Sequence, residues 1–469
     1  MDDTALSARE MATLLADGSI TAEDYARALI DRAIAWAGLN AFITLDADGV
    51  LEAARAADAK RASGADLGPL HAVPIVLKDN IDTAGLPTTG GTPALRAQRP
   101  ARNAPVAQAL VDAGALILGK TNLHELAFGI TSNNAGFGAV RNPYDKSKIP
   151  GGSSGGTAAA VAARLAPAGL GTDTGGSVRV PAALCGIIGF RPTVGRYDRA
   201  GIVPISHTRD TAGPMARSMD DIVLLDGVIT GGPTTLRPAA LAGLRLGVPR
   251  PHFWENLDPA VAGLAERALD ELRANGVVLI DVEVTEVARF NEATSFPVAL
   301  HEVVTDLAAY LTDSGSRLTL ADVVAETASP DVNGLLSGLI GGEAMPDEVY
   351  EAALFIHRPA LQTAYRNCFA DNNVAGLVFP TTPLPARPIG EDETVDLNGE
   401  RVPTFPTFIR NTDPSSNAGI PGLSLPIGLT DDGLPVGIEI DAPEGRDERL
   451  LGIGLACAPL FGEVPKPGP

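Results

Sequence analysis

Hydrophobic positions follow two spacings along this chain. A periodicity of three to four residues predicts helices at 7–16, 21–37, 48–62, 104–113, 157–165, 218–230, 258–275, 298–311 and 346–371. Short continuous apolar runs predict buried strands at 40–45, 73–80, 115–118, 244–248, 277–282, 376–379, 422–427 and 434–440. Strands that alternate with helices indicate an α/β layered architecture built on a large sheet.

The same pattern suggests how the chain is divided. We predict one domain, 1–469, in which N-terminal helices (1–65) precede a catalytic core (66–230). Residues 231–284 and 373–469 would supply the rest of the sheet. Residues 285–372 are rich in helical patterns and poor in strand patterns, which predicts a lobe on the sheet and not an independent domain.

A glycine- and serine-rich stretch at 149–180 interrupts this pattern. Ser153 and Ser177 each follow glycines and lie 24 residues apart. Glycine lets the backbone approach a ligand closely, and a serine beside free backbone N–H groups is a candidate nucleophile. A flexible linker is the competing interpretation. However, the run at 157–165 between the two serines is apolar and helix-forming, which favours two site loops held by a buried core.

Composition and charge exclude several functions. The net charge of −21 argues against binding to nucleic acids or to anionic membrane surfaces. The three cysteines and six histidines form no zinc-site spacing, so we expect no metal and no cofactor. No signal peptide and no apolar run of about 20 residues is visible, which predicts a cytoplasmic protein.

Two motif matches are misleading. Residues 114–121 match the phosphate-binding pattern G-x-x-x-x-G-K-[ST], but the four residues between the glycines are themselves the predicted strand 115–118. Residues 151–155 match the G-x-S-x-G pattern of α/β-hydrolases. That triad needs a downstream histidine, and His207, His301 and His357 do not lie in an obvious strand-end loop near the C-terminus.

Lys78 supplies a candidate base for the two serines. It ends the apolar run 73–78, and a buried, neutral lysine can accept a proton. Ser153 would lie near a helix N-terminus, where developing negative charge is favoured. Residues 174–177 offer consecutive backbone N–H groups that could hold an oxyanion.

Three motifs together resemble the amidase signature family. They are Val-Pro-Ile-Val-Leu-Lys-Asp-Asn at 73–80, Gly-Gly-Ser-Ser-Gly-Gly at 151–156 and Gly-Thr-Asp-Thr-Gly-Gly-Ser-Val-Arg at 171–179. The resemblance implies a large mixed β-sheet core covered by helices on both faces. It also implies a triad in which Ser177 is the nucleophile, Ser153 the bridging residue in a cis peptide bond, and Lys78 the base.

The resemblance extends to the surroundings of the triad. It implies that Thr174, Gly175 and Gly176 donate to the oxyanion and that the carbonyl of Ala127 faces the substrate. We predict that a loop of five residues binds the substrate: Ala127, Phe128, Gly129, Ile130 and Thr131. One departure is Glu439, where members of the family usually carry glutamine.

Within the family, the segments 124–132, 189–193, 203–208 and 409–413 resemble indoleacetamide and mandelamide hydrolases most. This favours cleavage of small aryl or aryl-alkyl amides through an acyl-enzyme, with carbamates and esters as further substrates. The alternative is the amidotransferase A subunit, a glutaminase within a tRNA-dependent complex. We expect a small-molecule amide or carbamate as ligand and a monomer or homodimer.

Overall fold

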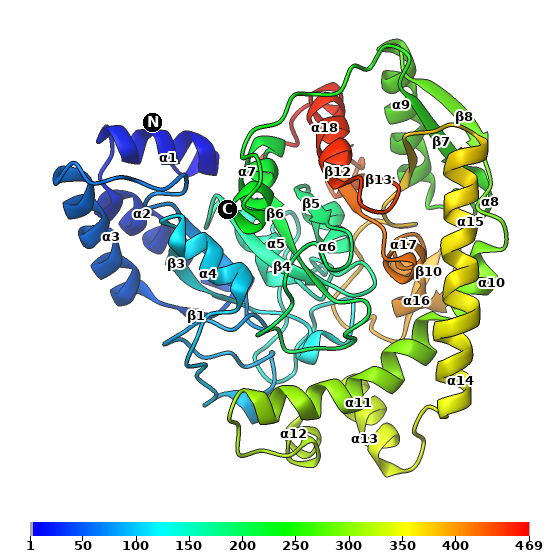
Figure 1. The fold of residues 1–469 in the computed structure, drawn as a ribbon, viewed down its shortest axis with the longest axis horizontal. Coiled ribbons are helices and arrows are strands. Elements are labelled where there is room, and N and C mark those ends of the chain that lie inside the picture. Colours follow the sequence, from blue (N-terminus) through cyan, green and yellow to red (C-terminus); the bar gives the residue numbers. More distant parts are fainter. Residues whose placement is uncertain (1–2, 469) are drawn as a thin grey trace.

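The sheet of this protein runs through the whole molecule. In the computed structural model, which describes residues 3–468, eleven strands form one mixed sheet in the order β1-β3-β2-β4-β6-β5-β12-β13-β9-β7-β8 (Figure 1). A separate hairpin pairs β10 with β11. The strands are β1 (Phe42–Leu45), β2 (Pro74–Lys78), β3 (Leu116–Thr121), β4 (Ala168–Asp173), β5 (Ile188–Arg191), β6 (Thr211–Ala216), β7 (Arg245–Pro249), β8 (Val278–Val282), β9 (Gly376–Pro380), β10 (Thr394–Leu397), β11 (Glu400–Pro403), β12 (Gly422–Leu429) and β13 (Pro435–Asp441).

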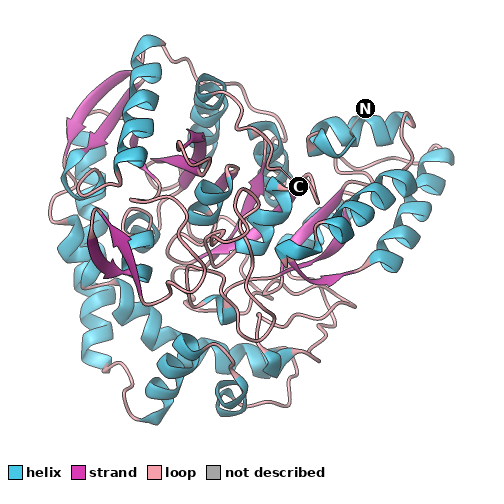
Figure 2. Ribbon diagram, turned by 180° about the vertical axis from the view of Figure 1, so that it is seen from behind, coloured by secondary structure: helices cyan, strands magenta, loops and turns pink. Residues whose placement is uncertain are grey.

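Helices cover both faces of this sheet, as expected for the α/β class. The view from behind shows helices around the periphery and loops filling the centre (Figure 2). The helices are α1 (Ala8–Asp17), α2 (Ala22–Ala35), α3 (Ala47–Ala62), α4 (Pro105–Asp112), α5 (Gly155–Ala162), α6 (Arg179–Cys185), α7 (Met219–Thr230), α8 (Arg250–Phe253), α9 (Pro259–Ala274), α10 (Val287–Glu292), α11 (Ser295–Asp313), α12 (Leu320–Glu326), α13 (Pro330–Gly341), α14 (Asp347–Ala352), α15 (Arg358–Asp371), α16 (Thr404–Ile409), α17 (Asp413–Ala418) and α18 (Asp447–Cys457).

Apolar periodicity located the regular helices well. The helix predicted at 21–37 is α2, and its N-cap is Thr21, whose side chain accepts a hydrogen bond from the N–H of Asp24. The predicted strands at 73–80 and 115–118 are β2 and β3, which pair in parallel. Residues 116–121 are therefore a strand and not a phosphate-binding loop. Lys120 is buried at its end, with its Nζ 3.1 Å from an oxygen of Asp79.

Several elements escaped the pattern. Strand β6 has the sequence Thr-Ala-Gly-Pro-Met-Ala, which carries little intrinsic strand preference. It is a strand because six consecutive residues pair antiparallel with β4. The short helix α6 was also not predicted, nor were β5, the β10–β11 hairpin and α18. Their form is determined by contacts with distant segments, which a local pattern does not contain.

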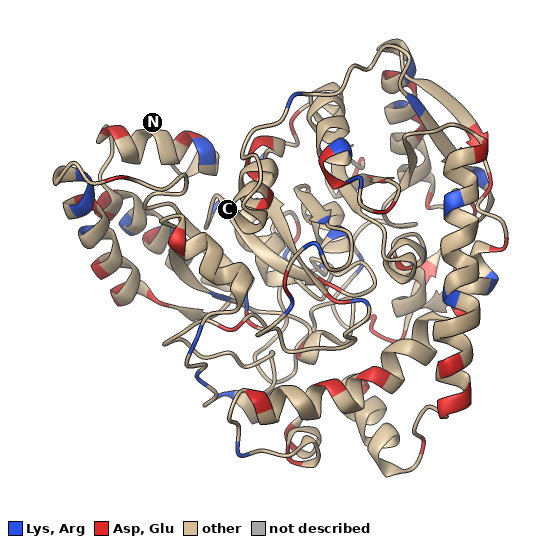
Figure 3. Cartoon of the chain, in the orientation of Figure 1, with Lys and Arg blue, Asp and Glu red and all other residues tan. Residues whose placement is uncertain are grey.

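The lobe at 285–372 contains helices α10 to α15 in the structure. Figure 1 places α11, α12 and α13 along one edge and the long α14–α15 segment beside them. Apolar side chains of α11 to α13, among them Leu307 and Leu336, pack in one cluster with Leu126 and Val203 of the core. Figure 3 shows that acidic residues occur along α11 and α14 of this lobe. Among the described residues, no helix combines the length and the hydropathy that a membrane crossing requires.

Candidate active site

Two neighbouring parallel strands carry Lys78 and Asp173 to the same end of the sheet, where both strands have their C-termini. β2 ends at Lys78 and β4 ends at Asp173, and the two strands pair through Leu77 and Leu170. The loop before α5 carries Ser153, and the loop after β4 carries residues 174–177. The first turn of α5 packs closely against the backbone at Asn122. A Cβ at Gly156 would lie 2.2 Å from the carbonyl oxygen of Asn122. The glycines of this segment therefore permit a close approach that fixes the position of Ser153.

Lys78 is fully buried and donates hydrogen bonds to two hydroxyl groups. Its Nζ lies 2.7 Å from Ser153 Oγ and 2.8 Å from Thr172 Oγ1. Burial lowers the pKa of Lys78 to about 7, against the opposing field of the carboxylates of Asp173 and Asp210. A substantial fraction of this lysine is then neutral near neutral pH and able to accept a proton.

The loops that carry Ser153 and Ser177 are joined by a backbone hydrogen bond. The peptide bond Gly152–Ser153 is cis, as the resemblance implied. The N–H of Ser154 donates to the carbonyl oxygen of Ser177 at 3.2 Å, so the two loops meet directly beside both serines. Ser177 is 8% exposed and lines a cavity, whereas Ser153 is 1% exposed. This burial leaves Ser177 as the serine that a ligand can reach.

Asp173 organises the loop that contains Ser177. Its carboxylate accepts hydrogen bonds from the N–H groups of Gly176 at 2.9 Å and Val178 at 3.1 Å. Although burial opposes ionisation, Arg179 and Arg191 hold the pKa of Asp173 well below its usual range. The carboxylate thus stays charged and keeps this turn closed.

The predicted oxyanion donors differ in availability. Because the N–H of Gly176 already donates to Asp173, Gly176 loses support as an oxyanion donor. Gly176 has φ 136°, and a Cβ there would lie 2.1 Å from Thr412 Oγ1. The same hydroxyl donates to the carbonyl of Gly175 at 2.7 Å. Thr174 and Gly175 line the cavity beside Ser177.

The cavity above Ser177 has a volume of about 290 Å³. All five residues of the predicted substrate loop, 127–131, line it. The lobe contributes Phe296 and Leu300, and α16 contributes Phe405 and Ile409. The walls are therefore largely apolar, and they combine segments that are far apart in the sequence.

Sequence reasoning missed several residues of this cavity. The charged ones are Asp331 from α13, Asp392 from the loop before β10, and the pair Arg209 and Asp413. Phe405 of α16 was also missed. The motif at 409–413 was noted only as a resemblance, and nothing in it indicated that Asp413 pairs with Arg209.

Glu439 lies outside the cavity, in a buried charge network. Its side chain forms an ion pair with Arg179, two residues after Ser177, and it is 0% exposed. Asp441, on the same face of β13, is equally buried. Burial raises the pKa values of both carboxyl groups, that of Asp441 well above its usual range. The replacement of glutamine by glutamate thus concerns support of the Ser177 loop and not contact with a ligand.

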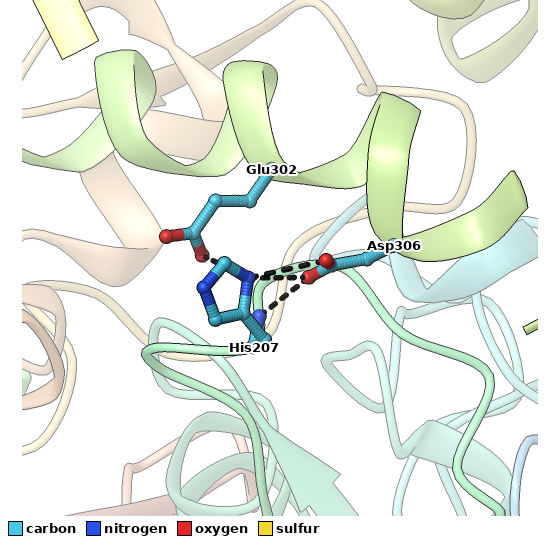
Figure 4. A group of neighbouring side chains, drawn as sticks. All are labelled: His207, Glu302 and Asp306. Atoms are coloured by element: carbon cyan, nitrogen blue, oxygen red, sulfur yellow. Dashed lines mark hydrogen bonds and ion pairs between the residues drawn. The ribbon is translucent and has the colours of Figure 1, made fainter. Parts of the chain in front are cut away.

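A second group of titratable residues lies between the 203–209 loop and α11. His207 Nδ1 lies 3.0 Å from Asp306 Oδ2 and 3.6 Å from Glu302 Oε2 (Figure 4). Glu302 is buried and also accepts hydrogen bonds from Thr208 and Tyr350. These donors satisfy its oxygens, so the arrangement needs no metal ion. It ties the 203–209 loop to α11.

Comparison with known proteins finds relatives along nearly the whole chain. The amidase family profile matches residues 24–451. An indoleacetamide hydrolase of Agrobacterium vitis is 48% identical, over 91% of this chain and 91% of its own length. A mandelamide hydrolase of Pseudomonas putida is 42% identical, over 98% and 92%. The crystal structure of a peptide amidase from Stenotrophomonas maltophilia superimposes with a TM-score of 0.86 at 31% identity and covers 98% of both chains. The chain therefore belongs to the amidase signature family of enzymes, which hydrolyse amides.

Proposed function

We propose that this enzyme cleaves small aryl and aryl-alkyl amides through an acyl-enzyme formed on Ser177. The observation that carries the proposal is the 2.7 Å hydrogen bond between buried Lys78 and Ser153, next to a serine that lines an apolar cavity. Neutral Lys78 accepts a proton from Ser153, and Ser153 in turn accepts the proton of Ser177. The hydroxyl oxygen of Ser177 then attacks the carbonyl carbon of the amide.

The remaining steps follow from the same groups. The amides of Thr174 and Gly175 stabilise the negative charge on the carbonyl oxygen. The relayed proton passes to the leaving nitrogen as the C–N bond breaks, and ammonia or an amine departs. Water then attacks the acyl carbon, loses its proton to the same relay and regenerates Ser177. Aryl carbamates and esters present an equivalent carbonyl carbon, so we include them as substrates.

The cavity supports small aryl groups over long chains. Its volume of about 290 Å³ matches the lower end of typical ligand pockets, and Phe128, Phe296 and Phe405 supply aromatic walls. The two curated hydrolases described above are named for amides of this kind, which agrees with the proposal.

A substrate panel on the purified chain alone tests the proposal. It contains indole-3-acetamide, mandelamide, phenylacetamide, an aryl carbamate, an aryl ester and glutamine. We expect turnover of the aryl amides, with loss of all turnover in Ser177→Ala. Ser147→Ala changes an exposed serine outside the cavity and serves as the matched control. Turnover of glutamine without turnover of any aryl amide would favour the amidotransferase function instead.

A further inference from the structure

The residues that line the cavity include more acidic than basic side chains. Arg209 and three aspartates, Asp331, Asp392 and Asp413, line it. Arg209 is 2% exposed, and Nη2 contacts Asp413 Oδ1 at 2.5 Å and the carbonyl oxygen of Thr174 at 3.1 Å. Its Nη1 donates to the carbonyl oxygen of Ser295 at 2.9 Å. This arginine is therefore engaged by the protein and is not free to receive an anionic ligand.

Asp413 is neutralised in the same contact. Its second oxygen accepts hydrogen bonds from Asn291 at 2.9 Å and Asn417 at 3.1 Å. The pair of Arg209 and Asp413 lies beside Thr174 and Gly175, at the reacting end of the cavity. It adds no net charge there.

Asp392 and Asp331 are different, because no arginine or lysine pairs with either of them among residues 3–468. Asp392 accepts hydrogen bonds from two neutral groups, Thr131 Oγ1 at 2.8 Å and Asn133 Nδ2 at 2.6 Å. Asp331 contacts His124 Nε2 at 2.9 Å, and its side chain is 48% exposed. The pKa of Asp331 is lowered because the hydrogen bond and the field of His124 outweigh the effect of its burial. Asp392 thus contributes a carboxylate whose hydrogen-bond partners are neutral, whereas the charge of Asp331 is partly offset by His124.

Asp392 is hydrogen-bonded directly to the substrate loop, and Asp331 is connected to it through His124. Thr131 Oγ1, which donates to Asp392, lies 3.4 Å from His124 Nδ1, and the other nitrogen of His124 faces Asp331. A hydrogen-bonded chain thus connects the loop before β10, the 127–131 loop and α13. It places both carboxylates on the part of the cavity formed by the substrate loop and the lobe, whereas Arg209 lies on the side of Thr174.

We propose that Asp392 and Asp331 form a recognition site for the positively charged or N–H-donating end of an amide substrate, and that they exclude substrates with an anionic end. This rests on the proposed amide hydrolysis, whose substrate class it narrows. An aryl group fills the apolar middle of the cavity, its amide lies at Ser177, and a donor on the far side of the ring meets the two carboxylates. An anion in the same place meets the carboxylate of Asp392, whose hydrogen-bond partners Thr131 and Asn133 are neutral.

Matched para-substituted phenylacetamides test this selectivity. The substituents are aminomethyl, which is cationic, methyl, which is neutral, and carboxyl, which is anionic. We expect kcat/KM to be about tenfold or more higher for the aminomethyl amide than for the methyl amide, and about tenfold or more lower for the carboxyl amide. In Asp392→Asn, which keeps the acceptor for Thr131, the ratio of aminomethyl to methyl falls about tenfold. Asp396→Asn, an exposed change on the nearby β10, leaves the ratio unchanged.

Equal kcat/KM values for the three amides in the wild type overturn the inference. So does an Asp392→Asn variant that slows all three by one common factor, because Asp392 then only holds the loop. If that variant does not fold, the salt dependence of the wild-type ratio decides: the preference must shrink as ionic strength rises. If no amide is hydrolysed at all, the proposed function fails. Calorimetric binding of benzylammonium against benzoate then still decides the charge preference, and equal affinities overturn it.

Discussion

Lys78 provides the sharpest prediction about pH. Its Nζ is fully buried, and burial moves its pKa from 10.5 to about 7. A shift of this size corresponds to roughly 5 kcal/mol of preference for the neutral amine. About one-tenth of the enzyme would carry neutral Lys78 at pH ~6, and about nine-tenths at pH ~8. The value of kcat/KM should therefore rise about tenfold over this range and become level above it.

An ordinary lysine would give a different profile. With a pKa of 10.5, well under one-hundredth of it would be neutral at pH ~8, and the rate would keep rising to about pH 10. Initial rates on phenylacetamide between about pH 5 and pH 10, in buffers of constant ionic strength, distinguish the two profiles. A profile that is flat below about pH 7, with the chemical step limiting, would refute the assignment of Lys78 as base.

A variant separates the role of the amine from its packing. Lys78→Met keeps much of the side-chain volume and removes the base, so kcat should fall by a factor of about 10²–10⁴. Lys60→Met, at an exposed position, is the control and should change nothing. Burial favours the neutral amine of Lys78. Between pH ~7 and ~10.5 the folded state therefore binds fewer protons than the unfolded chain. Stability from this group therefore increases as pH rises through that window, and the variant should lose this dependence in chemical denaturation.

Two further substitutions test the supports of the site. Gly129→Ala should lower kcat/KM for all amides and lower the free energy of unfolding by about 1–3 kcal/mol, because its Cβ would lie 2.1 Å from His124. Gly334→Ala, which meets no atom within 4 Å, is the control in thermal denaturation and should not destabilise the fold. Glu439→Gln should reduce the loss of stability with rising pH. Burial raises the pKa values of Glu439 and Asp441, so the folded state holds a proton that the unfolded chain releases above about pH 4. Urea denaturation of the wild type and of Glu439→Gln at about pH 5 and about pH 9 measures this difference. An equal change in the free energy of unfolding between the two pH values would contradict the prediction.

The sequence contained most of the local information about this fold. Regular helices such as α2 were predictable because their apolar face, cap and length are local properties. Strands rich in β-branched and leucine residues, such as β2, were predictable for the same reason. By contrast, β6 depends on its pairing with β4, and residues of low strand preference give no sign of that.

The residues of the candidate site also fall into two groups, those that a local motif predicts and those that only the fold brings together. Lys78, Ser153 and Ser177 lie in motifs of distinctive composition, and the structure brings Lys78 and Ser153 into contact. Asp392 reaches the cavity from a segment more than 200 residues after Ser177, so no local pattern could place it there. The N–H of Gly176 donates to Asp173, a contact that only the folded structure shows. The predicted role of Gly176 as an oxyanion donor therefore has less support than the roles of the other two residues.

Covalent labelling of Ser177 tests the central claim most directly. Phenylmethylsulfonyl fluoride places an electrophilic sulfur and an aryl ring in the cavity, so the activated hydroxyl should displace fluoride and remain sulfonylated. Intact-mass and peptide mass spectrometry of the purified chain should show one adduct, located on Ser177, with activity lost in proportion. The adduct should be absent in Ser177→Ala and form much more slowly in Lys78→Met. Stoichiometric labelling of any other residue, or inactivation that persists unchanged in Lys78→Met, would contradict the account.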